Sequence, residues 1–225
     1  HKGGLHADAM AKWEGSYQHI QPELVGNYQR ILVSELSVRS NVLAKAKELG
    51  LELPPRGSEV PKVLGTVKYL EAQGFQFEGA EGSFELLIRR AQSGYCPPFQ
   101  LLDFLVLVEK RTDREILAEA TIKVQVGDRV MHTAAEGNGP VNALDAALRK
   151  ALISFYPVLD SVRLTDYKVR ILDETAGTEA KTRVLIETSD GHNTWATVGS
   201  STNIIEASWQ ALADSLEYAL IKNGY

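Results

Sequence analysis

Apolar and polar residues alternate through the second half of the chain with the period of two that is typical of β-strands. Residues 115–126 show the alternation, residues 101–110 before them are apolar and rich in β-forming residues, and residues 129–135 form the third expected strand. Gly127-Asp128 supplies a hairpin turn between the last two segments. Apolar residues then recur with the helical period over 140–155. The pattern therefore predicts three strands followed by one amphipathic helix.

The same order of elements occurs a second time along the chain. Moving the sequence by 64 residues places Gly127 on Gly191 and aligns strand and helix positions of the same kind. The matched pairs are Val141 and Ile205, Ala143 and Ala207, Leu148 and Leu212, Leu152 and Leu216, Ile122 and Ile186, and Leu107 and Ile171. One register that holds across strands and helix predicts an internal duplication. The expected strands of the second copy are 161–173, 181–189 and 193–200, and its expected helix is 204–222.

The first part of the chain has a different pattern. Its helical periods predict three short helices, at 42–49, 58–74 and 83–94. Cys96-Pro97-Pro98 marks the expected boundary, because the period changes there. Each later helix must lay its apolar face on a sheet, so we expect an α+β fold. Helical linker subdomains would occupy 1–95, and a domain of two pseudo-symmetric β-β-β-α units would occupy 96–225.

Composition narrows the classes of partner. The chain has 225 residues, a net charge of −5 and no basic cluster, so nucleic acid is not an expected partner. Its only cysteine, Cys96, precludes an internal disulfide and is typical of a cytoplasmic protein. Neither a membrane span nor a signal peptide is visible, so no membrane partner is expected. Because the chain starts at His1, without methionine and inside an organised motif, we expect a fragment of a longer protein.

Two histidines and an aspartate lie close together at the start of the chain, at His1, His6 and Asp8. Such a group is found in functional sites, and it is also found in exposed terminal loops, so the residues alone leave both interpretations open. His1 and His6 lack a third ligand at a familiar metal-binding spacing. No metal site is therefore predicted in this chain.

Each predicted helix of the duplicated region begins after a turn of small or polar residues. These turns are Gly137-Asn138-Gly139, ahead of Pro140, and residues 200–203. A helix N-terminus offers free backbone N–H groups and attracts a carboxylate or phosphate. Small and aliphatic residues surround the turns: Ala134, Val141, Ala176, Ala180, Ile204 and Ile205. The mixture suits a small anionic ligand with an aliphatic tail, such as a branched-chain amino acid; equally, the turns could serve only to pack the two units together.

Four motifs together resemble the 2-isopropylmalate synthase family, which includes citramalate and homocitrate synthases. They are His1-Lys2-Gly3-Gly4-Leu5-His6-Ala7-Asp8, Gly137-Asn138-Gly139-Pro140-Val141, residues 16–27 and residues 32–41. The last two segments are similar to the citramalate synthase branch. The resemblance covers essentially the whole chain.

The resemblance implies a catalytic (β/α)₈ barrel followed by linker subdomains and a regulatory domain of two β-β-β-α units. A barrel takes roughly 250 residues, so this chain would hold only the last two parts. The implied reaction condenses acetyl-CoA with a 2-oxo acid, which is pyruvate for citramalate synthase, on a divalent metal in the absent barrel. His6, Asp8 and Tyr17 would reach the partner's barrel as catalytic residues. This chain alone would hold no cofactor and would be inactive.

The family's regulatory domain implies a homodimer that binds the pathway end product near its interface. The effector would contact seven residues: Gly137, Gly139, Val141, Asn142, Ala176, Ala180 and Ile204. Its ammonium group would need carbonyls or an acid, for which Glu136 or Glu206 could serve. Isoleucine is the expected effector for citramalate synthase, and leucine is the alternative for 2-isopropylmalate synthase. Two further hypotheses are a purely structural dimerisation module and a self-sufficient enzyme that uses His1, His6 and Asp8.

Overall fold

The computed structural model describes residues 13, 20, 22–26, 39–51, 53 and 57–225. The chain divides into two compact units, His1–Tyr95 and Cys96–Tyr225, and each is described here by itself. Within the described residues, no helix combines the length and the apolar character that crossing a membrane requires.

The described part of the first unit is helical, as the period of its apolar residues predicts. A short 3₁₀ helix, η2 (Pro22–Val25), precedes three α-helices, α2 (Arg39–Glu48), α3 (Glu59–Ala72) and α4 (Glu81–Ala91). The face of α3 that carries Val60, Val63 and Val67 is buried. Phe84 of α4 packs on Phe77, with ring centroids 6.2 Å apart. These contacts bury the apolar faces of α3 and α4.

The second unit contains the duplicated β-β-β-α order. Its first half has β1 (Gln100–Glu109), β2 (Leu117–Val126), β3 (Arg129–Gly137) and α5 (Pro140–Leu152). Its second half has β4 (Arg163–Ile171), β5 (Thr182–Ser189), β6 (Thr194–Ser201) and α6 (Ile204–Lys222), with short 3₁₀ helices η3 (Pro157–Asp160) and η4 (Glu174–Glu179) between elements. The strands form two antiparallel three-stranded sheets, β1-β2-β3 and β4-β5-β6. The α+β fold predicted from the sequence is confirmed.

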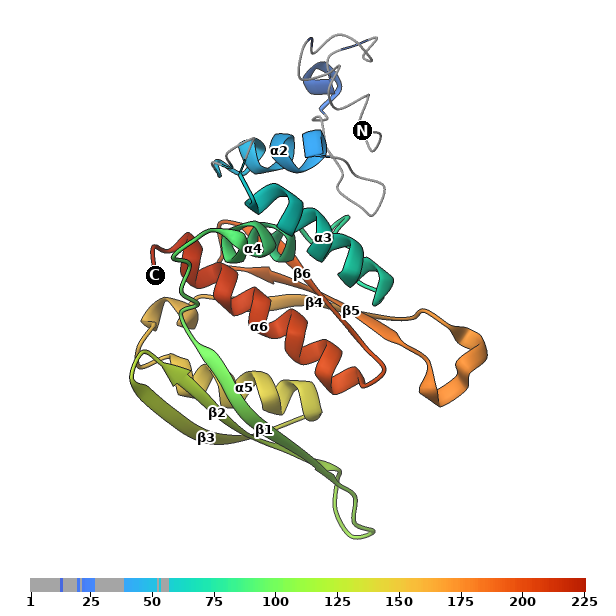
Figure 1. Cartoon of the computed structure of the whole chain (residues 1–225). Helices are drawn as coiled ribbons and strands as arrows, with labels where there is room; N and C mark the ends of the chain where they lie inside the picture. The colour runs from blue at the N-terminus through green and yellow to red at the C-terminus, as the bar shows by residue number, and fades with distance from the viewer. Residues whose placement is uncertain (1–12, 14–19, 21, 27–38, 52, 54–56) are drawn as a thin grey trace. The chain divides into compact units, whose positions relative to one another are not determined.

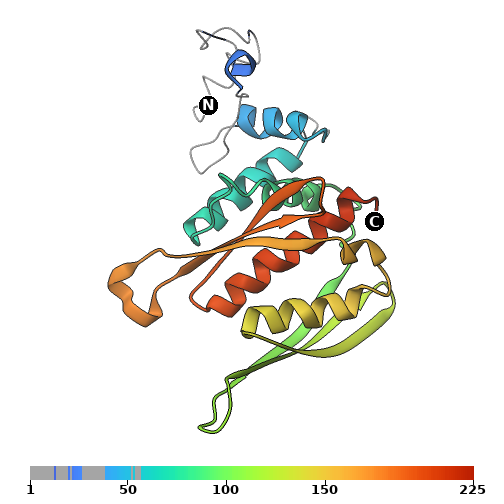
Figure 2. The same cartoon turned by 180° about the vertical axis from the view of Figure 1, so that it is seen from behind.

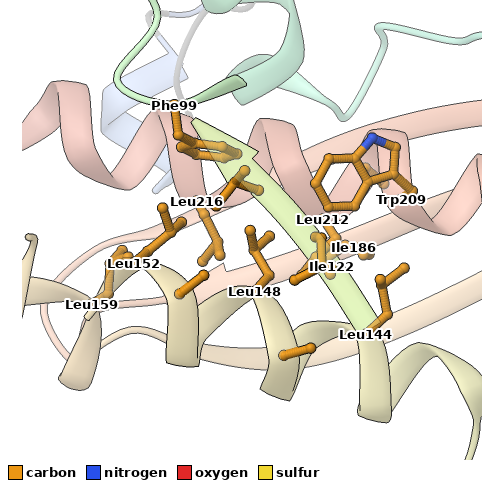
Figure 3. Close-up of a cluster of buried hydrophobic side chains, with 14 of the residues drawn as sticks. Phe99, Ile122, Leu144, Leu148, Leu152, Leu159, Ile186, Trp209, Leu212 and Leu216 are labelled. Atoms are coloured by element: carbon orange, nitrogen blue, oxygen red, sulfur yellow. The ribbon is translucent and has the colours of Figure 1, made fainter. Parts of the chain in front are cut away.

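The two helices of this unit lie between its two sheets (Figures 1 and 2). Strand β2 alternates because every second side chain, from Ala118 to Val126, points at the helices and is buried. Helix α5 contributes Leu144, Leu148 and Leu152 to the same core, and α6 contributes Leu212 and Leu216 (Figure 3). One apolar cluster therefore joins both repeats.

The structure corrects one detail of the duplication. The third strands and the helices keep the 64-residue shift, but the first strands do not. Phe104 pairs with Ile122, whereas Tyr167 pairs with Ile186, so β1 and β4 are related by 63 residues. The predicted equivalence of Leu107 and Ile171 is therefore wrong by one position. The reason is that the second hairpin contains one more residue between the paired positions Tyr167 and Ile186 than the first contains between Phe104 and Ile122.

Candidate functional site

A cavity of about 570 Å³ opens between the first turns of α5 and the start of β4. Helix α5 contributes one face to it and β4 contributes side chains on the facing side. The residues that line the cavity are Val141, Asn142, Asp145, Arg149, Arg163, Leu164 and Tyr167. Apolar, aromatic and charged groups thus meet in one concave place, which is the usual composition of a small-molecule site.

The cavity lies between α5 and β4, whereas side chains fill the equivalent space between α6 and β1. Asp145 of α5 corresponds to Trp209 of α6, and Tyr167 of β4 corresponds to Phe104 of β1. The rings of Trp209 and Phe104 pack with centroids 5.7 Å apart, and Trp209 is only 7% exposed. A short aspartate in place of the indole leaves the space between α5 and β4 open.

Tyr167 is held in place from beneath by α6. Its hydroxyl lies 2.7 Å from Oγ of Ser208. Ser208 donates its single hydroxyl proton to the carbonyl of Ile204, at 2.6 Å, so the Tyr167 hydroxyl is the donor in the first bond. This chain of hydrogen bonds fixes the tyrosine ring in the cavity wall and connects the cavity to the first turn of α6.

Charged side chains of both signs complete the lining: Asp145 and Arg149 on α5, and Arg163 at the start of β4. Arg149 Nε lies 2.8 Å and 2.9 Å from the two carboxylate oxygens of Asp145, and both side chains are 19% exposed. Arg149 Nη1 also donates to the carbonyls of Leu159, at 3.2 Å, and Val162, at 2.8 Å. Arg163 Nη1 donates to the same Val162 carbonyl at 3.0 Å. Arg149 therefore ties α5 to the segment that leads into β4.

The start of α5 lacks the cap that α6 possesses. Oδ1 of Asn203 accepts the backbone N–H of Ile205, at 2.8 Å, and of Glu206, at 3.4 Å. The equivalent N-cap residue of α5 is Gly139, which has no side-chain oxygen to offer. Pro140 follows it and has no N–H. The backbone N–H groups of the first turn that lack an intrahelical acceptor are therefore those of Val141 and Asn142.

Close packing of α5 on the end of β3 depends on Gly137. A Cβ at this position would lie 2.5 Å from the backbone N of Ala143 and 2.6 Å from Oδ1 of Asn142. That Oδ1 accepts the backbone N–H of Asn138 at 3.1 Å. Gly139 is different, because a Cβ there would meet no atom within 4 Å.

The structure brings together some of the predicted effector residues. Gly137, Gly139, Val141 and Asn142 gather at the start of α5, and the last two line the cavity. Three others do not line it: Ala176 and Ala180, at η4 and its C-cap, and Ile204, which is linked to Tyr167 through Ser208. The predicted catalytic residues His6, Asp8 and Tyr17 lie outside the described residues.

Sequence reasoning missed the polar wall. Neither Glu136 nor Glu206, the acids expected to meet an ammonium group, lines the cavity, whereas Asp145 does. Comparing equivalent positions of the two repeats would have found it, because an aspartate aligned with a tryptophan signals a groove filled in one copy and open in the other.

The described residues contain no group of three or more histidine, cysteine, aspartate or glutamate side chains placed to hold a metal ion. One carboxyl group with a shifted pKa, that of Asp166, adjoins the cavity residue Tyr167 in the sequence. A hydrogen bond from Lys168 lowers the pKa of Asp166, which precedes Tyr167 in β4. Asp166 is not among the side chains that line the cavity, so this pair does not contribute to its charge.

Comparison with known proteins places these features in context. Residues 78–220 match the family model described as the LeuA allosteric (dimerisation) domain, and residues 1–74 match the homocitrate synthase post-HMGL domain-like family. The chain is 53% identical over 224 residues to the (R)-citramalate synthase of Geobacter sulfurreducens and 51% identical over 224 residues to that of Aquifex aeolicus. These alignments cover 99% of this chain and 42% of each relative, so the chain spans less than half the length of these curated proteins.

Proposed function

Because the chain belongs to the LeuA allosteric (dimerisation) domain family, we propose that it is the regulatory and dimerisation part of a citramalate synthase. In this proposal the cavity between α5 and β4 binds isoleucine as a feedback inhibitor. The longer enzyme would condense acetyl-CoA with pyruvate on a divalent metal held in its barrel. His6, Asp8 and Tyr17 remain the predicted catalytic contributors to that barrel.

The observation that carries the proposal is a cavity with apolar and charged lining at an uncapped helix start. A ligand carboxylate would accept the backbone N–H groups of Val141 and Asn142, which α5 leaves without an intrahelical partner. The aliphatic side chain would lie against Val141, Leu164 and Tyr167. A volume of about 570 Å³ is ample for one amino acid.

Inhibition requires that the amino acid bind one arrangement of the longer enzyme more tightly than another. The cavity suits this role, because one wall, α5, belongs to the first repeat and the other, β4, belongs to the second. Arg149 bonds the backbone carbonyl of Val162, and Tyr167 is connected through Ser208 to the backbone carbonyl of Ile204. A ligand that bridges α5 and β4 favours the arrangement in which both are fixed. Dimerisation, which the family description names, would carry that preference to a second copy.

Calorimetric titration of isoleucine, leucine and valine into the 225-residue chain tests the proposal. We expect isoleucine to bind with the highest affinity, and Leu164→Ala to weaken its binding about tenfold, because part of an aliphatic contact is lost. Leu105→Ala is the matched control, since Leu105 lies in β1, outside the cavity, and is 68% exposed. It should bind isoleucine as the unaltered chain does.

The same titration separates the competing assignments. A preference for leucine would move the chain to the 2-isopropylmalate synthase branch, and a one-methyl rearrangement is worth about 1–3 kcal/mol, which is readily measured. A folded, dimeric chain that takes up none of the three amino acids would leave a structural dimerisation module. Turnover of acetyl-CoA and pyruvate by the isolated chain would support a self-sufficient enzyme.

A further inference from the structure

Asp145 is the only acidic side chain among the residues that line the cavity. An ionised carboxylate has about four acceptor positions on its two oxygens. Arg149 supplies a single N–H, from Nε, shared between both oxygens. Acceptor capacity therefore remains on Asp145, which lines the cavity.

We propose that Asp145 accepts the α-ammonium group of the ligand, so that the cavity selects an amino acid over the 2-oxo acid of the same carbon skeleton. This inference rests on the proposed function and concerns the basis of selection at the same site. Selection of the amino acid over the 2-oxo acid matters because the longer enzyme is proposed to act on a 2-oxo acid. An effector site that also bound such acids would respond to substrate as well as to end product.

The spacing along α5 supports this assignment. Asp145 lies four residues after Val141, so both side chains are on one face of the helix and roughly 5–6 Å apart at Cβ. In an amino acid, carboxylate and ammonium are attached to the same carbon. Side chains of a helix lean toward its N-terminus, so the Asp145 carboxylate extends back toward the helix end where a ligand carboxylate would meet the N–H groups of Val141 and Asn142. The ammonium group on the adjoining carbon of the ligand would meet it there.

Arg149 is a positioning residue for this carboxylate. Two backbone carbonyls, of Leu159 and Val162, accept its Nη1, so the guanidinium is anchored independently of any ligand. Its Nε then holds Asp145 in one orientation. Together Arg149 and Arg163 give the cavity two positive charges, and without Asp145 the lining would favour any carboxylate, with or without an amino group.

The duplication argues that the fold itself does not demand an acid at this position. The equivalent residue of α6 is Trp209, which packs on Phe104 and is buried. If Asp145 served only to anchor Arg149, the cavity would bind ligands with and without an amino group alike. An ammonium acceptor would make binding depend on the amino group, and this difference separates the two roles.

The experiment is calorimetric titration of isoleucine and of its 2-oxo acid into the unaltered 225-residue chain, Asp145→Asn and Asp103→Asn. The asparagine at 145 keeps an oxygen for Arg149 Nε and removes the charge. Asp103→Asn is the matched control, because Asp103 is also ion-paired, with Lys123 at 3.1 Å, and does not line the cavity. Thermal melting of each variant checks that it is folded.

We expect the unaltered chain to bind isoleucine at least about tenfold more tightly than the 2-oxo acid. Asp145→Asn should lose about 10- to 100-fold in affinity for isoleucine, the effect of a hydrogen bond to a charged group, and bind the 2-oxo acid at least as well as before. Asp103→Asn should bind both compounds as the unaltered chain does.

Two results overturn the inference alone: equal affinity of the unaltered chain for both compounds, or isoleucine binding that Asp145→Asn leaves unchanged. The first needs no variant, so it holds even if the substitution disturbs the fold. Failure of the unaltered, folded chain to bind isoleucine or any other amino acid overturns the proposed function, and the inference with it.

Discussion

Replacing Gly137 by alanine should move the start of α5 and so disturb both stability and binding. The added Cβ would lie 2.5 Å from the backbone N of Ala143 and 2.9 Å from its Cα. Ordinary contacts begin near 3.4 Å, so helix and strand must separate by roughly 1 Å in a core packed like a crystal. Backbone atoms cannot rotate away as a flexible side chain would.

The cost follows from overpacking, which typically destabilises by about 1–3 kcal/mol. For a protein of this size that corresponds to a melting temperature lower by roughly 3–10 °C. The displaced first turn also carries the N–H groups proposed to bind the carboxylate. We therefore expect the affinity of Gly137→Ala for isoleucine to fall about tenfold or more, since each charge-assisted hydrogen bond is worth about 1.5–3 kcal/mol.

The assay is thermal melting with and without isoleucine, followed by calorimetric titration. Gly139→Ala is the control, because its Cβ would meet no atom within 4 Å and its backbone is extended, at φ −172°. It should cost at most about 1 kcal/mol, since alanine is a poor N-cap. If Gly137→Ala melts and binds like the unaltered chain, or if Gly139→Ala is the more harmful change, the steric reasoning is wrong.

Three further predictions follow from the differences between the repeats and from the last hairpin. Trp209→Ala should destabilise by about 3–5 kcal/mol in denaturant unfolding, because it empties a filled groove. Gly139→Asn should cap α5 as Asn203 caps α6, gaining a few tenths of a kcal/mol while weakening isoleucine binding in calorimetry. Asp190 should titrate by NMR with a pKa below the ordinary aspartate value, because the backbone N–H of Asn193 bonds its carboxylate. Its stabilisation is then complete above about pH 4 and lost as the pH falls through that depressed pKa.

Local burial explains why much of the fold could be predicted from the sequence. Alternation from Ala118 to Val126 follows directly from one face of β2 packing on helices, and it does not depend on what the partners are. The hairpin at Gly127 needs a positive φ, 56° here, which glycine adopts without strain. Pro140 begins α5 where its fixed φ and missing N–H are tolerated.

Features that depend on distant residues could not be predicted. The second hairpin has one more residue between its paired positions, which shifts β4 against β1. Strict alternation would reveal such a shift, but β1 and β4 do not alternate strictly. The sequence predicted the start of α5 as part of a ligand site, but the wall that faces it across the cavity comes from β4 of the other repeat. Leu164 and Tyr167 reach the cavity only through the packing of the two β-β-β-α repeats on each other. Ala176 and Ala180, which were predicted from their small size and from the family resemblance, lie at η4 and its C-cap and do not line this cavity.

The proposed site lies where equivalent positions of the two repeats differ. Asn203 caps α6 where Gly139 leaves α5 uncapped, and Trp209 fills a groove where Asp145 leaves one open. Each difference removes stabilisation from one repeat; the missing cap alone is worth a few tenths of a kcal/mol relative to asparagine. A ligand that supplies a carboxylate to the helix end and apolar contacts to the groove replaces both losses. Saturating isoleucine should therefore raise the melting temperature of the unaltered chain, and should do so less in Gly139→Asn, where the cap is already present.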